Sequence, residues 1–315
     1  MYSQILFFVF LVLSINGCQS KTTDSEFTFL RDDQGLEILE DGQSVLFYQE
    51  KPKSPTGENF CNNYIHPLFS LDGDTLTEEF PKDHPYHRGI FLAWHQVHIN
   101  GESVGNSWIM EDLETDVRGV NYRTSDNAAI LETDVAWKSP LYQERKEFMN
   151  EKALIKVHSL ENNIRKIDYV ITLKALVNGV EIGGADNEKG YGGLSMRIKL
   201  PEDMIFSSIN GAIEPEVKQI KVGPIMDFSG SFSEKESKSG VALLCHPNTP
   251  NYPAPWILRS KKSMQNVVFP GQELFSLPIN KEVKLYYRFI VHNGDASDIQ
   301  LSELQSEYEA VNFKD

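Results

Sequence analysis

Cysteine is scarce in this 315-residue sequence, which contains only Cys18, Cys61 and Cys245. That number excludes a small fold held together by several disulfide bonds. Nucleotide motifs are also missing, because the glycine-rich stretch at residues 183–193 lacks the Gly-Lys-Ser/Thr of a P-loop and the strand–helix context of a dinucleotide site. Basic residues are outnumbered, with 30 Lys and Arg against 45 Asp and Glu, and the net charge of −15 argues against nucleic acid as a partner.

Long apolar runs are absent after the N-terminus. The first one, residues 5–15, has the length of a signal-peptide core and is too short to span a membrane. A small residue, Gly17, then precedes Cys18, as in the lipobox of bacterial lipoproteins. We therefore predict a signal peptide at 1–17, a lipid on Cys18, a tether at 18–26 and one β domain at 27–315. The alternative is an ordinary secretory signal followed by a chance cysteine.

These targeting features predict a location in the bacterial cell envelope, on the periplasmic or outer-membrane face, with the lipid as the only attachment to the membrane. An oxidising compartment of this kind would allow Cys61 and Cys245 to pair. Two separate buried thiols are an equally open interpretation, because sequence does not reveal their distance.

Short apolar or alternating runs separated by turn residues indicate β-strands through most of the chain. Residues 36–40 and 43–48 flank Asp41-Gly42, which predicts a hairpin with the favoured Asp-Gly turn. Further predicted strands are 128–137, 142–148, 153–158, 167–176, 194–200, 205–209, 241–245, 266–269 and 283–291. No helical periodicity lies between them, so we predict an all-β fold, a large antiparallel β-sandwich, with a mutarotase-like supersandwich as one form of it.

One helix is predicted, at the C-terminus. Ser297 and Gln300 have the spacing of a capping box. An apolar stripe then follows at intervals of three and four residues, formed by Leu301, Leu304, Tyr308 and Val311. This stripe is expected to pack on the sandwich.

The densest group of reactive side chains lies at residues 83–95, which read Asp-His-Pro-Tyr-His-Arg-Gly followed by an apolar run ending in Trp94-His95. A polar turn running into an apolar strand is typical of side chains presented at the mouth of a pocket. Histidine serves in proton transfer and as a metal ligand, so the cluster predicts acid–base, metal or anion chemistry. For a metal, His66, His84 and His87 are the candidate ligands, although spacing does not define a third ligand for the last two.

Other polar constellations lie elsewhere in the chain. Glu144 and Glu147 are three apart on a predicted strand, so at most one of them faces a pocket, and a solvated charged face is the alternative. Arg88 offers a fork for a carboxylate, a phosphate or vicinal hydroxyls, or else pairs with Asp83. The stretch at 183–193 is expected to be a mobile loop over a pocket, followed by Arg197 on a strand.

Aromatic residues stand beside several of these polar groups, a combination that suits sugar binding because ring faces stack on C–H surfaces. Aromatic core packing is the alternative interpretation. The candidate catalytic residues are His66, His87, Glu144 and His246. The candidate substrate-binding residues are Arg88, Trp108, Arg197, Trp256, Arg259 and His292.

Together these segments resemble the bacterial family labelled DUF6807, also called "PmoA-like", whose members are secreted proteins often of Bacteroidota. The matching motifs include Tyr64-Ile65-His66-Pro67, Asp83-His84-Pro85-Tyr86-His87-Arg88-Gly89, Glu144-Arg145, Gly192-Gly193-Leu194-Ser195-Met196-Arg197, His246-Pro247, Trp256 with Arg259, and His292-x-Gly294. The resemblance implies a β-sandwich and a setting of carbohydrate use. Tyr86 stands where the family usually has a second His, which puts in doubt a metal site that needs His there. The methane monooxygenase subunit behind the label is membrane-embedded, and this sequence has no span to match it.

We therefore expect a periplasmic lipoprotein that acts on a sugar or glycoside by His/carboxylate acid–base chemistry, in an epimerase-like or glycoside-modifying reaction without a cofactor. A non-catalytic sugar-binding lipoprotein and a metal-dependent enzyme are the alternatives. The partner is a small molecule or an oligosaccharide. We further predict that His66, His87, Arg88 and His246 meet in one concave site, with Trp108 or Trp256 as a wall.

Overall fold

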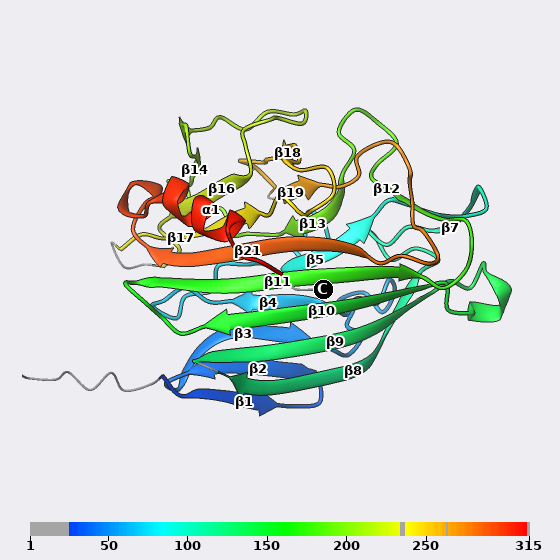
Figure 1. Ribbon diagram of the computed structural model, residues 1–315, viewed down its shortest axis with the longest axis horizontal. Helices are drawn as coiled ribbons and strands as arrows, with labels where there is room; N and C mark the ends of the chain where they lie inside the picture. Colours follow the sequence, from blue (N-terminus) through cyan, green and yellow to red (C-terminus); the bar gives the residue numbers. More distant parts are fainter. Residues whose placement is uncertain (1–24, 126, 234–236, 263, 314–315) are drawn as a thin grey trace, which may run out of the picture.

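The computed structural model describes residues 25–125, 127–233, 237–262 and 264–313, and in them the chain is built almost entirely from antiparallel strands (Figure 1). The largest sheet contains, in spatial order, β15 (Gly211–Ala212), β14 (Ile205–Ser208), β16 (Ile225–Gly230), β17 (Ser239–Cys245), β21 (Val283–Asn293), β11 (Ile164–Ala175), β10 (Met149–His158), β9 (Ala128–Lys138) and β8 (Glu114–Ser125). The predicted all-β class is thus confirmed.

Two smaller sheets complete the architecture. The eight-stranded sheet has the order β1 (Phe27–Arg31), β2 (Gly35–Glu40), β3 (Gln43–Gln49), β4 (Tyr64–Leu68), β5 (Ile90–Trp94), β13 (Gly192–Met196), β19 (Gln265–Val268) and β18 (Trp256–Ile257). The four-stranded sheet has the order β20 (Phe275–Ser276), β12 (Val180–Gly183), β6 (Gln96–Ile99) and β7 (Glu102–Gly105).

The nine-stranded and eight-stranded sheets pack face to face, as expected for a sandwich. Figure 1 shows the long strands β8 to β11 crossing over the N-terminal strands, and one continuous apolar core joins the two layers. At its centre, the rings of Trp94 on β5 and Trp137 on β9 lie 5.7 Å apart. Alternation along β10 explains the packing, because Ala153, Ile155 and Val157 are buried while Leu154 and Lys156 between them are partly exposed on the other face. Burying each such branched side chain contributes roughly 2 kcal/mol.

The predicted Asp-Gly hairpin is confirmed between β2 and β3. Asp41 has a φ of 51° and Gly42 a φ of 78°, so both central residues adopt the left-handed conformation that matches the twist of the flanking strands.

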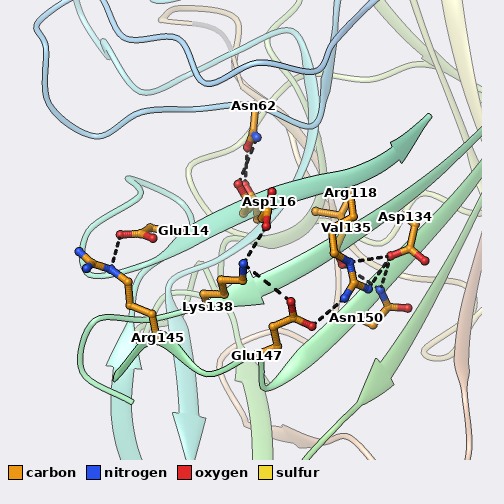
Figure 2. A network of polar contacts seen from close by, with 11 residues as sticks. Asn62, Glu114, Asp116, Arg118, Asp134, Val135, Lys138, Arg145, Glu147 and Asn150 are labelled. Atoms are coloured by element: carbon orange, nitrogen blue, oxygen red, sulfur yellow. Dashed lines mark hydrogen bonds and ion pairs between the residues drawn. The ribbon is translucent and has the colours of Figure 1, made fainter. Parts of the chain in front are cut away.

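The predicted strand at 142–148 is wrong. Residues 143–145 form instead the short 3₁₀ turn η1 (Gln143–Arg145), in which all three residues have positive φ. Residues 143–145 carry exposed polar side chains and none of them is buried, so the chain turns before β10 begins. Figure 2 shows exposed ion pairs beside this turn, including Arg145 with Glu114 at 3.1 Å and Glu147 with Arg118 at 2.7 Å.

The C-terminal helix is α1 (Leu301–Glu309), and its apolar stripe packs on the large sheet as predicted. Leu301, Leu304 and Tyr308 are buried there. The expected capping box is wrong in position. It is formed by Asp295 and Asp298 around the 3₁₀ turn η2 (Ala296–Asp298), where Asp298 accepts a hydrogen bond of 2.8 Å from the Asp295 amide. Aspartate at both positions supplies the acceptors, so the chain turns two residues earlier than Ser297 suggested.

Cys61 and Cys245 are both buried and both free, which answers the open question of their pairing. Burial raises the pKa of each thiol. The proposed signal peptide and Cys18 lie outside the described residues. Within those residues, no helix has the length and apolarity needed to cross a membrane.

Candidate functional site

The His-rich segment lies on the outer face of the eight-stranded sheet, and strand alternation explains why. Phe91 and Trp94 are three residues apart on β5, so they face opposite ways. Trp94 points into the sandwich toward Trp137, which leaves Phe91 pointing outward. Trp108 packs on that outward ring at 5.6 Å, and the guanidinium of Arg88 lies over it at 4.3 Å. Loops joined to β5, β13, β18 and β19 therefore gather above this face.

These loops enclose a pocket of about 450 Å³. Its lining consists of His84, Tyr86, His87, His95, Trp108, Ala185, Asn187, Lys189, Tyr191, Arg259, Lys261, Lys262 and Met264. A hollow of similar size, about 480 Å³, lies on the outer face of the large sheet near Phe313, but no histidine lines it. We place the candidate site in the first pocket because titratable and aromatic side chains converge there.

Three of the candidate catalytic and substrate-binding residues line this pocket, namely His87, Trp108 and Arg259, and so does the candidate metal ligand His84. The glycine-rich stretch contributes four further lining residues, which include Lys189 and Tyr191. Arg197 lies directly behind the lining and contacts it through His87.

Arg197 holds His87 in one tautomer. Its guanidinium is 4% exposed and forms ion pairs of 2.9 Å with both Glu78 and Asp83. A third contact joins Arg197 Nη1 to Nδ1 of His87 at 3.2 Å. A guanidinium only donates hydrogen bonds, so Nδ1 of His87 accepts, and the ring proton resides on Nε2.

The pKa of His87 is lowered to about 2, first by burial and then by the electrostatic influence of His84, Arg197 and Arg88. The ring is therefore neutral at any physiological pH. Its remaining nitrogen, Nε2, can donate a hydrogen bond to a bound molecule, and it has no lone pair with which to accept a proton.

Asp83 and His84 form a second polar pair in the same loop. His84 Nδ1 lies 2.9 Å from Asp83 Oδ2, and the other carboxylate oxygen is held by Arg197. Burial opposes ionisation of Asp83, but the hydrogen bonds from His84 and Arg197 outweigh it and lower its pKa to about 2. The carboxylate is thus an acceptor, Nδ1 of His84 is the donor, and Nε2 of His84 is left with a lone pair. The ring of His84 stacks on that of His87 at 4.6 Å with an interplanar angle of 2°.

Aromatic rings form the wall of the pocket. Trp108 stacks on His95 at 5.0 Å, meets Tyr191 at 5.6 Å and receives the edge of His87 at 6.0 Å. Burial lowers the pKa of His95 to about 4, so this ring is also neutral near pH 7. The wall is therefore an uncharged aromatic surface beside two polar imidazoles, with the Tyr191 ring tilted by 54° from that of Trp108.

Arg88 braces the wall from behind and does not line the pocket. The side chain is 3% exposed and donates to the carbonyl oxygens of Tyr86 at 3.0 Å, Trp108 at 3.3 Å and Ser107 at 3.3 Å. The predicted pair of Arg88 with Asp83 is not formed, because Asp83 pairs with Arg197 instead.

Other predicted site residues lie elsewhere, so the expected convergence is not found. His66, on β4, contacts Thr77 Oγ1 at 2.9 Å and lies outside the lining. His246 lies beside the C-terminal helix, with its ring 5.2 Å from Tyr308 and 5.1 Å from Phe313. The His87 segment leads into β5 of the eight-stranded sheet, whereas His246 follows β17 of the nine-stranded sheet. The order of the segments in the sequence does not indicate that they lie in different sheets.

Three more candidates are also apart from the pocket. Trp256 is fully buried and donates from Nε1 to the Gly223 carbonyl at 2.9 Å. His292 is fully buried in the large sheet, 2.8 Å from Asp227. Glu144 is exposed in η1, and its backbone conformation directs it to solvent rather than to a strand face.

No metal centre is assembled in the part of the chain that the structure describes, where no three His, Cys, Asp or Glu side chains are placed to hold an ion. The stacked rings of His84 and His87 show the physical reason. Their in-plane nitrogen lone pairs lie in two parallel, stacked planes, so they do not meet at one point.

Sequence reasoning missed three features of the pocket. His84 was considered only as a metal ligand, although its neighbour Asp83 already supplied the carboxylate that orients an imidazole. His95 and Tyr191 were not singled out as site residues. His95 follows Trp94 at the end of β5, and Tyr191 precedes Gly192 at the start of β13. Trp94 and Gly192 are paired in the sheet, and this long-range pairing cannot be read from the sequence.

Comparisons with known proteins support the resemblance seen in the motifs. No curated protein matches this chain. The model of a family described as "Family of unknown function (DUF6807)" matches residues 35–305, which includes every residue that lines the pocket. The chain therefore belongs to the DUF6807 family.

Proposed function

We propose that this DUF6807 protein is a carbohydrate-active protein of the bacterial cell envelope, and that the pocket around His84 and His87 is its active site. The observation that carries the proposal is the juxtaposition of an Asp–His pair with a wall of aromatic rings. Flat rings such as Trp108 and Tyr191 suit the C–H faces of a sugar, while imidazole nitrogens suit its hydroxyl groups.

In this proposal His84 is the group that transfers protons. Its Nδ1 donates to Asp83, and this hydrogen bond orients the ring and leaves Nε2 directed to a substrate as a base. After taking up a proton, the imidazolium is stabilised by the same carboxylate. His87 serves as a neutral donor that positions a hydroxyl or carbonyl oxygen through Nε2–H. In this proposal Asp83 takes the role of the catalytic carboxylate that was predicted for Glu144.

The reaction class follows from the groups in the lining. Glycoside hydrolysis uses two carboxylates on either side of the scissile bond. Among the described residues that line the pocket, there is no Asp or Glu. Interconversion of the two anomers of a sugar moves one proton from the anomeric hydroxyl to the ring oxygen as the bond between C1 and the ring oxygen breaks, and back again as that bond re-forms. A base of the His84 kind can accept this proton and return it. We therefore favour an epimerase-like reaction over hydrolysis.

A second candidate function is that of a sugar-binding lipoprotein without catalysis. The neutral state of His87 and His95 favours it, since two of the three imidazoles in the pocket offer hydrogen bonds and no proton transfer near pH 7. The same wall and the same donors would then serve recognition alone.

Replacing His84 with glutamine is expected to lower kcat by about 100- to 10,000-fold on any sugar that the protein turns over, because it removes the proposed base. Sugar affinity should change little, since the amide keeps a polar group in the same place. The measurement is turnover of a panel of monosaccharides and disaccharides, combined with calorimetric titration of each sugar.

The matched control is His98→Gln, because His98 lies on β6 outside the pocket lining. This variant should keep full turnover and affinity. Turnover that survives His84→Gln would refute the acid–base role. Wild-type protein that binds a sugar of the panel without converting it would establish the binding function instead.

The location in the cell envelope is a proposal with its own test. Replacing Cys18 with serine should move the protein from the membrane fraction to the soluble fraction, because the acyl chains are the only anchor that we propose. The measurement is fractionation of cells followed by a high-salt wash. A Cys18→Ser protein that stays with the membrane after the wash contradicts the lipoprotein assignment.

A further inference from the structure

The lining of the pocket is positively charged, in contrast to the chain as a whole. Four lining side chains are cationic, namely Lys189, Arg259, Lys261 and Lys262, and none of the described lining residues is acidic. The whole chain has a net charge of −15. A random patch of this surface would thus be negative, so the composition does not account for the charge of the pocket.

These cations lack acidic partners among the residues that the structure describes. Arg259 donates to the carbonyl oxygens of Glu216 at 2.7 Å and Val217 at 2.9 Å, and to the hydroxyl of Tyr191, all of which are neutral acceptors. Its guanidinium also lies 5.3 Å from the Tyr191 ring centroid. These contacts fix the orientation of the Arg259 guanidinium at the pocket, and no carboxylate among the described residues neutralises its charge.

The lysines of the lining also lack an acidic partner among the described residues. No ion pair with a described residue is formed by Lys189, Lys261 or Lys262. The neighbouring Lys218 differs, because it pairs with Glu188 at 2.7 Å. Acidic partners are thus available in this region of the surface and are engaged by a lysine outside the pocket.

A further cation lies behind the wall. Arg88 is 3% exposed, and its hydrogen-bond acceptors are carbonyl oxygens and the sulfur of Met110. Its Nε has no partner among the described residues. A buried charge without a counter-ion is costly, and an anion held nearby would offset that cost.

The acidic groups closest to the pocket are already engaged. Glu78 and Asp83 both pair with Arg197, and Asp83 also binds His84. Asp186 accepts from Gln272 at 3.1 Å and lies outside the lining. The pocket therefore presents donors and cations to its occupant, with no carboxylate to repel an anion.

From this arrangement we propose that the ligand is an acidic saccharide, a sugar whose carboxylate is bound by Lys189, Arg259 and Lys261. The inference rests on the proposed sugar site and specifies its substrate class. The Nε2–H of His87 is a further donor for the same carboxylate. A simple anion would leave most of the 450 Å³ empty and would not contact the rings of Trp108 and Tyr191.

The test compares sugars that differ only in the charged group. Purified protein is titrated calorimetrically with D-glucuronate and D-galacturonate, and with D-glucose and D-galactose, which carry a hydroxymethyl group at the same position. We expect the uronates to bind at least about tenfold more tightly at low ionic strength, with the difference shrinking as salt is added.

The double variant Lys189→Gln/Lys261→Gln should reduce the preference for uronates over hexoses about tenfold, because it removes two charges from the lining. The control Lys218→Gln, outside the pocket, should leave the preference unchanged. Equal affinity for uronates and hexoses would overturn the acidic-sugar inference and leave the sugar site standing. Binding of neither class would overturn both. Inorganic phosphate that binds as tightly as the uronates would overturn the saccharide part and identify a simple anion site.

Discussion

Replacing Gly89 with alanine is expected to lower the free energy of unfolding by more than about 3 kcal/mol, because the added methyl group has no space and the backbone has an unfavourable conformation. Gly89 has a φ of 47°, and a Cβ atom there would lie 2.0 Å from the Ile65 carbonyl oxygen and 2.7 Å from His66 Cβ. The backbone cannot retreat easily. The Gly89 amide donates to the Glu78 backbone carbonyl oxygen at 2.8 Å, and the Gly89 carbonyl oxygen accepts from the Arg197 amide at 2.7 Å.

The effect would extend to the pocket, because Gly89 joins the His-rich loop to β5. Equilibrium unfolding in urea measures the stability loss. The control is Gly42→Ala in the β2–β3 hairpin, where φ is 78° but nothing lies within 4 Å of the added Cβ. That variant carries the cost of the left-handed conformation alone, about 1–2 kcal/mol. If Gly89→Ala costs no more than Gly42→Ala, the close approach of β4 is not what requires glycine.

The second large effect is expected at the buried pair of Asp227 and His292. Replacing Asp227 with alanine should cost about 3–5 kcal/mol, because it leaves a buried imidazolium without its partner. Both residues are 0% exposed, and His292 Nε2 lies 2.8 Å from Asp227 Oδ1. The other ring nitrogen, Nδ1, lies 3.1 Å from the carbonyl oxygen of Asn293. Both acceptors require an N–H, so the folded ring carries two protons and a positive charge.

Urea unfolding of Asp227→Ala against the wild type measures this cost. The control is Glu114→Ala, which breaks the exposed pair with Arg145 and should cost less than about 1 kcal/mol. That pair is seen at the surface in Figure 2, with side chains 60% and 49% exposed. Equal losses in the two variants would contradict the argument from burial.

The same pair predicts a pH dependence. Burial opposes the charged form of His292, but the hydrogen bond and charge of Asp227 outweigh it, with a smaller contribution from Asp298, and the pKa of His292 is raised. The folded state therefore holds a proton that the unfolded state releases above an ordinary histidine pKa of about 6.5. The stabilisation is complete below that pH and is lost as pH rises through the raised pKa.

Thermal unfolding from neutral to alkaline pH tests this sign. The Tm of the wild type should fall over the range in which His292 loses its proton in the folded state. Asp227→Asn should have a lower Tm and a flatter profile, because the uncharged amide no longer favours the imidazolium. A variant whose Tm falls as steeply as that of the wild type would show that other groups cause the pH dependence.

The sequence by itself determined the all-β class, the Asp-Gly hairpin and long strands such as β9, β10, β11 and β21. Alternation in β10 and the stripe of α1 are local patterns, and Asp41-Gly42 specifies its turn through the conformations that these two residues tolerate. The positions of the histidines within residues 83–95 also predicted where reactive groups gather, since the loop before a buried strand has few places to present polar side chains.

Only the tertiary structure decided which of those groups meet. His246 and His292 look equivalent to His87 in sequence, yet they lie on the large sheet, because β17 and β21 pair with each other rather than with β5. The order of strands in a sheet depends on long-range pairing, which the alternation along a single strand does not encode. The distinct roles of His84 and His87 have the same origin. Arg197 arrives from β13, more than a hundred residues away, and its guanidinium decides which ring keeps a free lone pair.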